Sequence, residues 1–331
     1  MTVLVTGAAG FIGYHVSRAL LARGEAVIGV DNLTPYYDPA LKRARLARLE
    51  AEPGFRFAEL DIADREAMTA LAREHAPAIT GVVHLAAQAG VRHSLTQPFD
   101  YVRSNLDGHM VVLEVCRHEL PALRHLVYAS SSSVYGGNNR VPFSVEDRVD
   151  DPVSLYAATK RADELMSHCY SHLYGLPATG LRFFTVYGPW GRPDMAAYLF
   201  AEAITQGRPI TLFNRGRMRR DFTYIDDITA GVLAALDRPP PRGTGGDQGP
   251  PHRIYNLGNN RPVELRDFVA ALEAALGRRA EIELAPMQPG DVPATWADIE
   301  ASRRDLGYQP TTPIEEGLAR FVEWYRSYHR R

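Results

Sequence analysis

Lysine is almost absent from this chain of 331 residues. Only Lys42 and Lys160 occur, and the other 35 of the 37 basic residues are arginine. Arginine is always charged and binds through a rigid fork, whereas lysine is a compact point charge whose pKa responds to its surroundings. A composition that avoids lysine so strongly suggests that a lysine is kept where arginine would not serve. For Lys160 we therefore expect a functional reason.

Cysteine and net charge are also scarce. The two cysteines, Cys116 and Cys169, lie in segments with helical patterns. We expect reduced core thiols rather than a disulfide, as is typical of a cytoplasmic protein. The formal net charge of -2 gives no electrostatic case for a nucleic-acid or anionic-membrane partner. We expect neither of these partners, and no metal site.

Long hydrophobic runs are missing too. The apolar start MTVLVTGAAGFIG has no basic leader and reaches a glycine cluster after six residues. We expect a buried strand there rather than a signal peptide or a membrane span.

The first half of the chain alternates between apolar runs and helical patterns. Runs that are apolar without alternation are typical of strands buried on both faces of a parallel sheet. Strands that alternate with helices predict an α/β fold, a Rossmann-type doubly wound parallel sheet. We predict strands over 2–7, 25–31, 55–61, 81–87 and 123–130, with helices over 13–24, 65–75 and 101–119.

The pattern loosens after about residue 180. We predict a dinucleotide-binding domain over 1–180 and a smaller C-terminal α+β lobe that occupies mainly 181–331. A strand near 253–258 is expected to return to the main sheet. The Pro/Gly-rich segment 239–252 is expected to be an exposed, mobile loop.

The glycines of GAAGFIG follow the first predicted strand and open the first predicted helix. In this context the first glycine permits a tight turn, the second lets the backbone approach a pyrophosphate, and the third lets helix and strand pack closely. Asp31 ends the second strand, where a carboxylate accepts from ribose hydroxyls and repels a 2'-phosphate, which favours NAD over NADP. The plainer reading is a glycine turn with a capping aspartate. The expected cofactor contacts here are Gly7, Gly10, Phe11, Ile12, Gly13, Asp31 and Asn32.

Two further strand ends belong to the same predicted site. Asp61 and Ile62 end the third strand and could reach an adenine edge, although Asp61 could equally cap the next helix. Leu85, Ala86 and Ala87 end the fourth strand with small side chains that leave room for a cofactor.

The segment YAATK separates Tyr156 and Lys160 by four residues, so on a helix they share one face. A lysine charge there favours the phenolate. A phenol in this setting can take a proton from a sugar hydroxyl while hydride leaves the same carbon. Such a pair is often only a surface pair, but this one follows a dinucleotide fold and a serine-rich strand end.

Taken together, the glycine motif, the strand-end Asp31, SSSSVYG, YxxxK and RFFTVYGP resemble the extended short-chain dehydrogenase/reductase family of NAD-dependent nucleotide-sugar epimerases, dehydratases and decarboxylases. The resemblance covers essentially the whole chain. It implies bound NAD that is regenerated in each turnover, a Ser131–Tyr156–Lys160 triad, and a homodimer through helices that include 151–174. It also implies that Gln88 and Asn105 lie near the cofactor and that Arg220 reaches the phosphates of UDP.

The positions that follow Ser131 indicate the reaction class. Dehydratases of this family carry Asp-Glu directly after the triad hydroxyl, and UDP-glucuronate decarboxylases carry Glu two places after it. Here the two positions are Ser132 and Ser133, which cannot act as acid or base near neutral pH. Epimerisation by return of hydride to the opposite face of a ketone is the reaction that remains.

Four segments resemble UDP-glucuronate 4-epimerases: 31–46, 84–95, 183–195 and 287–298. The resemblance implies a UDP-uronic acid substrate whose carboxylate is held by Ser132, Ser133, Thr185 and Arg192. An arginine fork with hydroxyl donors suits a carboxylate. Neutral-hexose epimerases usually carry Asn at the position of Thr185 and Arg at that of Gln288.

Several alternatives stay open at this point. Arg192 could be a loop arginine paired with Asp194, and Arg92 could serve either the site or the fold. UDP-glucose 4-epimerase is the first alternative activity and UDP-glucuronate decarboxylase the second. A non-catalytic NAD-binding scaffold is a third, although such proteins commonly lose the tyrosine or the lysine that this chain keeps.

Overall fold

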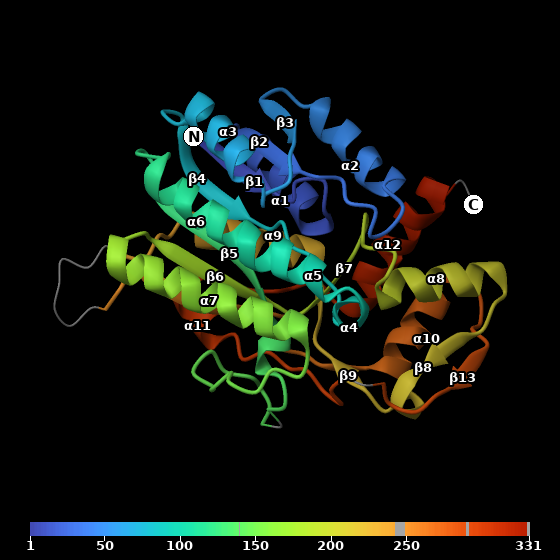
Figure 1. Cartoon of the computed structure of the whole chain (residues 1–331). Coiled ribbons are helices and arrows are strands. Elements are labelled where there is room, and N and C mark those ends of the chain that lie inside the picture. Colours follow the sequence, from blue (N-terminus) through green and yellow to red (C-terminus); the bar gives the residue numbers. More distant parts are fainter. Residues whose placement is uncertain (139, 242–248, 289–290, 330–331) are drawn as a thin grey trace.

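A computed structural model describes residues 1–138, 140–241, 249–288 and 291–329 of the chain. Within these residues the largest sheet has seven strands, all paired in parallel, in the order β11-β6-β5-β4-β1-β2-β3 (Figure 1). The predicted doubly wound α/β fold is confirmed. The strands are β1 Thr2–Thr6, β2 Ala26–Asp31, β3 Phe55–Glu59, β4 Ile79–His84, β5 His125–Ser131, β6 Ala178–Phe183 and β11 His252–Leu257.

Helices cover both faces of this sheet. One face carries α3 Arg65–His75, α6 Gly108–His118 and α7 Leu155–Tyr174, and the other carries α1 Phe11–Ala22 and α9 Ile225–Leu236 (Figure 1). Beside them, α2 Ala40–Glu50 packs on α1 and β3, and α11 Glu300–Leu306 packs on α9 and β11.

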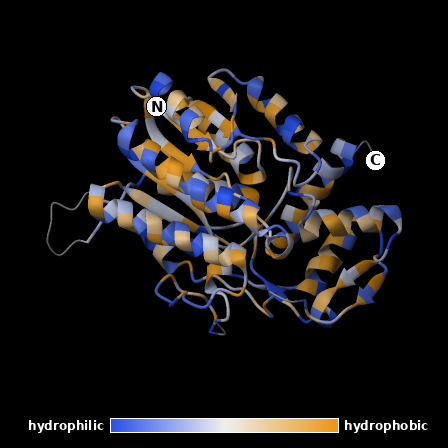
Figure 2. Cartoon of the chain, in the orientation of Figure 1, coloured by the Kyte–Doolittle hydropathy of each residue, from blue (hydrophilic) through white to orange (hydrophobic). Residues whose placement is uncertain are grey.

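The side chains of each strand point alternately to the two faces of the sheet, which divides the core into two layers. In β1, Val3 and Val5 belong to the core on the side of α1 and α9, whereas Leu4 belongs to the core on the side of α3 and α6. Successive side chains of a strand point to opposite faces, so a strand covered on both sides must be apolar throughout. Figure 2 shows the central strands as hydrophobic and the covering helices as mixed.

The C-terminal lobe shares the first of these cores. Its buried Phe268 and Tyr325 belong to the same apolar cluster as Val3 and Val5. A continuous core resists separation of the lobe from the sheet because any opening would expose apolar surface. The lobe contains α8 Ala196–Gln206, α10 Leu265–Leu276 and α12 Ile314–His329, with the strand pairs β8 Ile210–Leu212 and β13 Ile282–Leu284, and β9 Arg219–Arg220 and β12 Val263–Glu264.

Short elements connect the sheet to the lobe. The pair β7 Thr185–Tyr187 and β10 Phe222–Tyr224 lies beyond the end of β6. The remaining elements are α4 His93–Thr96, α5 Pro98–Tyr101, the π-helix η1 Val102–Asp107, and the 3-10 turns η2 Ser132–Tyr135 and η3 Phe213–Gly216.

The returning strand and the two cysteines test what was expected from the sequence. The segment expected to return to the sheet forms β11 beside β6. The expectation of core thiols holds for Cys116, whose pKa is raised by burial, but is wrong for Cys169, which is exposed on the outer side of α7. Residues 242–248 of the predicted mobile loop lie outside the described residues. Among the described helices none is both long and apolar enough to cross a bilayer. The domain boundaries stay a prediction.

Candidate active site

A cleft of about 830 Å³ opens at the carboxyl ends of the central strands. The strand order reverses there between β1 and β4, and open α/β sheets bind ligands at such a place. Loops after β1, β2, β3, β4 and β5, the start of α7 and the lobe form its walls. Every residue predicted to bind or react lines it, with the exception of Asn105. One cleft therefore brings the cofactor and substrate candidates together.

The glycine loop forms the floor of the cleft at the end of β1. Gly7 has a φ of +72°, and a Cβ there would lie 2.8 Å from the backbone nitrogen of Ala86. A Cβ on Gly13 would lie 2.0 Å from the carbonyl oxygen of Gly7. Side chains at these positions would force the loop away from its neighbours. Because α1 begins directly behind the loop, its free N–H groups and positive dipole end suit a pyrophosphate, so these residues fit NAD.

The cofactor's ribose is expected at Asp31, whose carboxylate is already partly occupied. Its Oδ1 accepts from the backbone nitrogen of Leu33 at 2.8 Å and from Lys42 Nζ at 3.0 Å. These bonds leave Oδ2 for a ribose hydroxyl. Lys42 is buried and offsets the charge of Asp31, so a 2'-phosphate is repelled less than by an unpaired aspartate.

Asp61 lies two residues beyond the end of β3. Its Oδ1 accepts from the nitrogen of Ala63 at 2.9 Å, and its Oδ2 accepts from Arg103 at 2.9 Å. The N-cap of α3 is Asp64. The reading of Asp61 as a helix cap is therefore wrong, because the chain needs three more residues to turn into the helix. Asp61 and the neighbouring Ile62 line the cleft.

Asn105 is buried behind the cleft wall. Its side chain pairs with the backbone of Gln88, accepting at 2.8 Å and donating at 3.1 Å, and it also donates to Thr159 on α7 at 2.9 Å. Asn105 thus fixes the strand-end segment of Gln88 against α7. Direct contact with a cofactor stays a prediction for Gln88, and the structure does not bring Asn105 itself to the cleft.

Tyr156 and Lys160 lie in the first turns of α7. The helix begins there because Ser154 caps it, accepting from the nitrogen of Ala157 at 3.1 Å. Both side chains line the cleft beside the serine loop, which we define as Ser130–Ser133.

A carboxylate that sequence reasoning missed accompanies the lysine. Lys160 Nζ donates to the Ala129 carbonyl at 3.1 Å and to Asp163 Oδ2 at 2.9 Å, and both charged side chains are buried. Burial raises the pKa of Asp163 to about 6, against the opposing effect of Lys160. Asp163 therefore offsets part of the positive charge that Lys160 can present to Tyr156.

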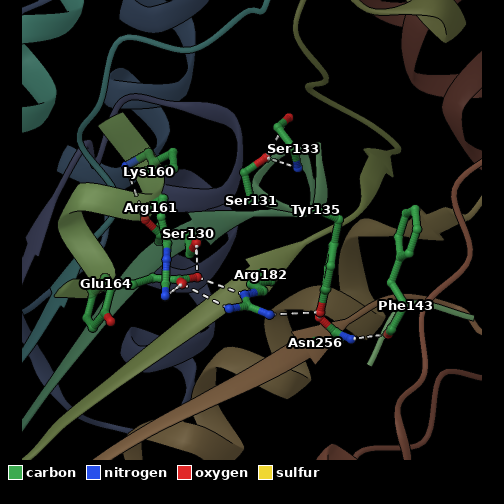
Figure 3. Close-up of polar contacts among 12 residues, drawn as sticks. Ser130, Ser131, Ser133, Tyr135, Phe143, Lys160, Arg161, Glu164, Arg182 and Asn256 are labelled. Atoms are coloured by element: carbon green, nitrogen blue, oxygen red, sulfur yellow. Dashed lines mark hydrogen bonds and ion pairs between the residues drawn. The ribbon is translucent and has the colours of Figure 1, made fainter. Parts of the chain in front are cut away.

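Ser130 has a different hydrogen-bond partner from Ser131 and Ser133. Ser131 Oγ accepts from the nitrogen of Ser133 at 3.1 Å and donates to its hydroxyl at 3.1 Å, whereas Ser130 Oγ donates to Glu164 at 2.7 Å. Figure 3 shows Ser131 and Ser133 together, and Ser130 turned toward Glu164. Ser131–Ser133 therefore present hydroxyl groups to the cleft, and their own side chains supply no carboxylate.

A buried network supports the serine loop from below (Figure 3). Arg182 donates to both carboxylate oxygens of Glu164 at 2.8 and 2.9 Å and to the hydroxyl of Tyr135 at 3.0 Å. Tyr135 donates to Asn256, whose amide donates to the Phe143 carbonyl. Burial alone would raise the pKa of Glu164, but the bonds and charge of Arg182 outweigh it and hold that pKa below its usual value.

Arg192 lines the cleft and is paired. Its Nε and Nη2 donate to Asp194 at 3.0 and 2.5 Å, which matches the alternative of a paired loop arginine. Asp194 and Thr185 line the same cleft, so the pairing does not remove Arg192 from the predicted sugar site.

Two further arginines lie where the lobe meets the cleft. Arg92, in the loop after β4, stacks over Phe213 at 5.0 Å and approaches Asp291 at 3.8 Å, so it reaches the lobe. Arg220 donates to the carbonyls of Arg219 and Pro293. Within the described part of the chain Arg220 makes no ion pair, and an unpaired guanidinium suits a phosphate.

Comparison with known proteins agrees with this geometry. The model of the NAD dependent epimerase/dehydratase family matches residues 3–258. The chain belongs to this family.

Family members with high similarity include epimerases of UDP-sugars. UDP-glucuronate 4-epimerase 4 of Arabidopsis thaliana is 53% identical over 336 residues, which cover 99% of this chain and 76% of that protein. The Bacillus cereus UDP-glucuronic acid 4-epimerase, solved with UDP-glucuronic acid and NAD, has a TM-score of 0.88 at 34% identity and covers 99% of this chain and 100% of that one. A Thermotoga maritima UDP-glucose 4-epimerase, solved with UDP-glucose, gives 0.86 at 30% identity, with coverage of 99% and 100%. The overall fold thus does not separate these substrates.

Sequence reasoning did not assign an active-site role to four charged or polar residues. Tyr36, Lys42 and Asp194 line the cleft, and Asp163 is buried behind it against Lys160. For Lys42 the signal was present, since the scarcity of lysine applies to it as much as to Lys160, and both line the cleft. For Asp163 a signal was present too, because it lies three residues after Lys160 on the same predicted helix, where side chains can meet. For Tyr36 no spacing rule was available, because its partner Asp194 is 158 positions away along the chain.

Proposed function

We propose that this protein catalyses the NAD-dependent 4-epimerisation of UDP-glucuronate to UDP-galacturonate through a transient 4-keto sugar. One observation carries the proposal. The cleft wall beside Tyr156 and Lys160 presents serine hydroxyls at Ser132 and Ser133, where elimination or decarboxylation would need an acid, and an arginine fork at Arg192. Hydroxyls and a guanidinium suit a sugar carboxylate that must be bound but not transformed.

Each residue then has a defined task. NAD held by the glycine loop and Asp31 would supply the hydride chemistry, with hydride leaving C4 and returning to the other face of the ketone, and would be unchanged overall. Tyr156 takes the proton of the C4 hydroxyl and later returns it. Lys160 stabilises the phenolate, and Ser131 hydrogen-bonds the C4 oxygen. Arg220 contributes to binding of the diphosphate, and the volume of the cleft leaves room for the ketone to turn over.

The carboxylate must be held firmly for a chemical reason. A glucuronate oxidised at C4 is a β-keto acid, which loses CO2 when its carboxylate is freed of hydrogen bonds and its C–C bond aligns with the ketone. Charge-assisted bonds from Arg192, with hydroxyl donors from Ser132, Ser133 and Thr185, keep the negative charge on the carboxylate and restrict that alignment. We include Arg92 among the proposed substrate-binding residues, because it reaches from the loop after β4 to the lobe.

A second candidate is UDP-glucose 4-epimerase. The observation that favours it is the bidentate pairing of Arg192 with Asp194, which already occupies part of the guanidinium. The test is to incubate purified protein separately with UDP-glucuronate, UDP-glucose and UDP-xylose and to resolve the products by chromatography. We expect UDP-galacturonate from the first. Conversion of UDP-glucose alone would replace the proposal with the second candidate.

We also propose that the protein is a homodimer. Apolar side chains lie exposed on α6 and α7, namely Met110, Leu165, Leu173 and Tyr174. Such a patch is typical of a protein interface. Light scattering should give twice the chain mass, and Leu165→Arg should lower the measured mass to that of one chain.

A cytoplasmic location stays a prediction.

A further inference from the structure

Asp194 forms the hub of a small polar cluster in the wall of the cleft. Its Oδ1 accepts from Arg192 Nε at 3.0 Å, and its Oδ2 accepts from Arg192 Nη2 at 2.5 Å and from the hydroxyl of Tyr36 at 3.0 Å. The guanidinium also lies 5.9 Å from the ring centre of Tyr36. All three side chains line the cleft.

Tyr36 is packed against the loop after β4 and the first residue of α4. Its ring packs against His93 with 4.8 Å between ring centres, and a Cβ on Gly90 would lie only 2.6 Å from its hydroxyl. Tyr36 follows Asp31 and Asn32 in the loop after β2. The cluster therefore joins the predicted ribose-binding loop to the loop that carries Arg192.

The Arg192–Asp194 pair is charged, and Asp194 occupies only one edge of the guanidinium. Burial would raise the pKa of Asp194, but Arg192 outweighs it and holds that pKa below its usual value, so the carboxylate is ionised near neutral pH. The side chains of Arg192 and Asp194 keep 22% and 28% of their surface exposed. The bonds to Asp194 use Nε and Nη2, which leaves Nη1 as the donor that Asp194 does not occupy.

We propose that Asp194 is a positioning residue that holds Arg192 so that its Nη1 edge is presented to the carboxylate of a UDP-uronic acid. This inference rests on the proposed function. Asp194 is not a competitor that releases the arginine, because release would leave a part-buried carboxylate with only the bond from Tyr36. Discrimination between a uronate and a neutral hexose then depends on the orientation of Arg192 as well as on its charge.

The test compares Asp194→Asn with the unaltered protein in the presence of NAD. Calorimetry measures binding of UDP-glucuronate, UDP-glucose and UDP. We expect about tenfold weaker binding of UDP-glucuronate, because one charge-assisted bond no longer orients the arginine, with the other two ligands unchanged. Tyr36→Phe should give a smaller change in the same direction. Asp237→Asn is the matched control, since it breaks a two-bond arginine pair with Arg23 away from the cleft.

Product analysis supplies a second readout. A loosened Arg192 should raise the share of UDP-4-keto-pentose. The C5–C6 bond breaks and CO2 leaves, and the bonding electron pair forms an enolate with the C4 ketone. C5 of the enolate then takes a proton from water, and the cofactor remains reduced. NADH fluorescence should rise accordingly.

Three outcomes would overturn the inference. Tighter binding of UDP-glucuronate by Asp194→Asn would make Asp194 a competitor, unchanged binding would make it irrelevant, and equal loss for all three ligands would make it merely structural. If Asp194→Asn does not fold, Tyr36→Phe decides by the same comparison. Failure of the unaltered protein to bind or convert UDP-glucuronate is a different result, because it counts against the proposed function itself.

Discussion

Two arginines of this chain each hold a carboxylate with two hydrogen bonds, in opposite surroundings. The side chains of Arg182 and Glu164 are 3% and 1% exposed beneath the serine loop, whereas those of Arg192 and Asp194 are 22% and 28% exposed in the cleft wall. Arg182 uses Nε, Nη1 and Nη2 on protein acceptors, and Glu164 also accepts from Ser130.

The difference teaches that the same pair of groups serves two purposes. A buried pair whose donors and acceptors are all satisfied adds rigidity, and removing one partner leaves an uncompensated charge away from water. A pair at a cleft that keeps one edge of its arginine unoccupied can still bind a ligand. The two pairs have the same chemistry. Their burial and the number of their hydrogen-bonding groups already in use distinguish the pair that supports the site from the pair that can bind a ligand.

The largest expected effect comes from Glu164→Gln. It leaves the buried Arg182 without a countercharge, so we expect the free energy of unfolding to fall by about 3–5 kcal/mol. The more exposed pair should matter less, and Asp194→Asn should cost about 1 kcal/mol or less. Chemical denaturation measures both. Equal losses from the two variants would remove the distinction between the pairs.

Tyr156→Phe should lower turnover while leaving the stability of the fold unchanged, in contrast to Glu164→Gln. We expect kcat to fall by about 100-fold to 10,000-fold because proton transfer at C4 is lost, with bound NAD and the free energy of unfolding retained. Tyr170→Phe is a matched control on the same helix, since the hydroxyl of Tyr170 bonds Glu114 outside the cleft. Retained turnover in Tyr156→Phe would contradict the assignment of the proton transfer.

Arg192→His should change the product rather than the fold. We expect the fraction of UDP-4-keto-pentose to rise about tenfold as the charge-assisted bond to the carboxylate is lost, and Ser133→Ala should give a smaller rise. Chromatography of the nucleotide sugars measures both. Arg148→His, at a largely exposed ion pair with Asp150, is the control. An unchanged product ratio would mean that this clamp does not suppress loss of CO2.

The smallest expected effect is the pH dependence of the buried pair. The pKa of Glu164 in the folded chain lies below its ordinary value of 4.5, so its contribution to stability is present above that pH and is lost as pH falls through the folded pKa. The stability advantage of the unaltered protein over Glu164→Gln should therefore shrink below about pH 4.5. Denaturant unfolding of both at several pH values checks this. An advantage that grows on acidification would refute the sign.

Much of the site was predictable because its residues are tied to local patterns. The glycine loop, Asp31, and the Tyr156–Lys160 pair follow strand and helix ends, whose positions are set by hydrophobic runs and caps. The sequence did not show that Asp163 acts with Lys160 or that Asp194 acts with Arg192 in the site. A carboxylate that is close in sequence to a basic residue can equally well face solvent. The placing of Asn105 behind the wall depended on the packing of the π-helix η1 against α7.

The sequence by itself determined the doubly wound sheet, the turn that suits a dinucleotide, and the lack of an acid at Ser132 and Ser133, because these depend on short-range spacing and on chemical identity. Only the tertiary structure decided which charges are paired. Lys42 meets Asp31 from a different element, and Tyr36 meets Asp194 across 158 positions of the chain. Such contacts arise from close packing of distant segments, which local periodicity does not encode.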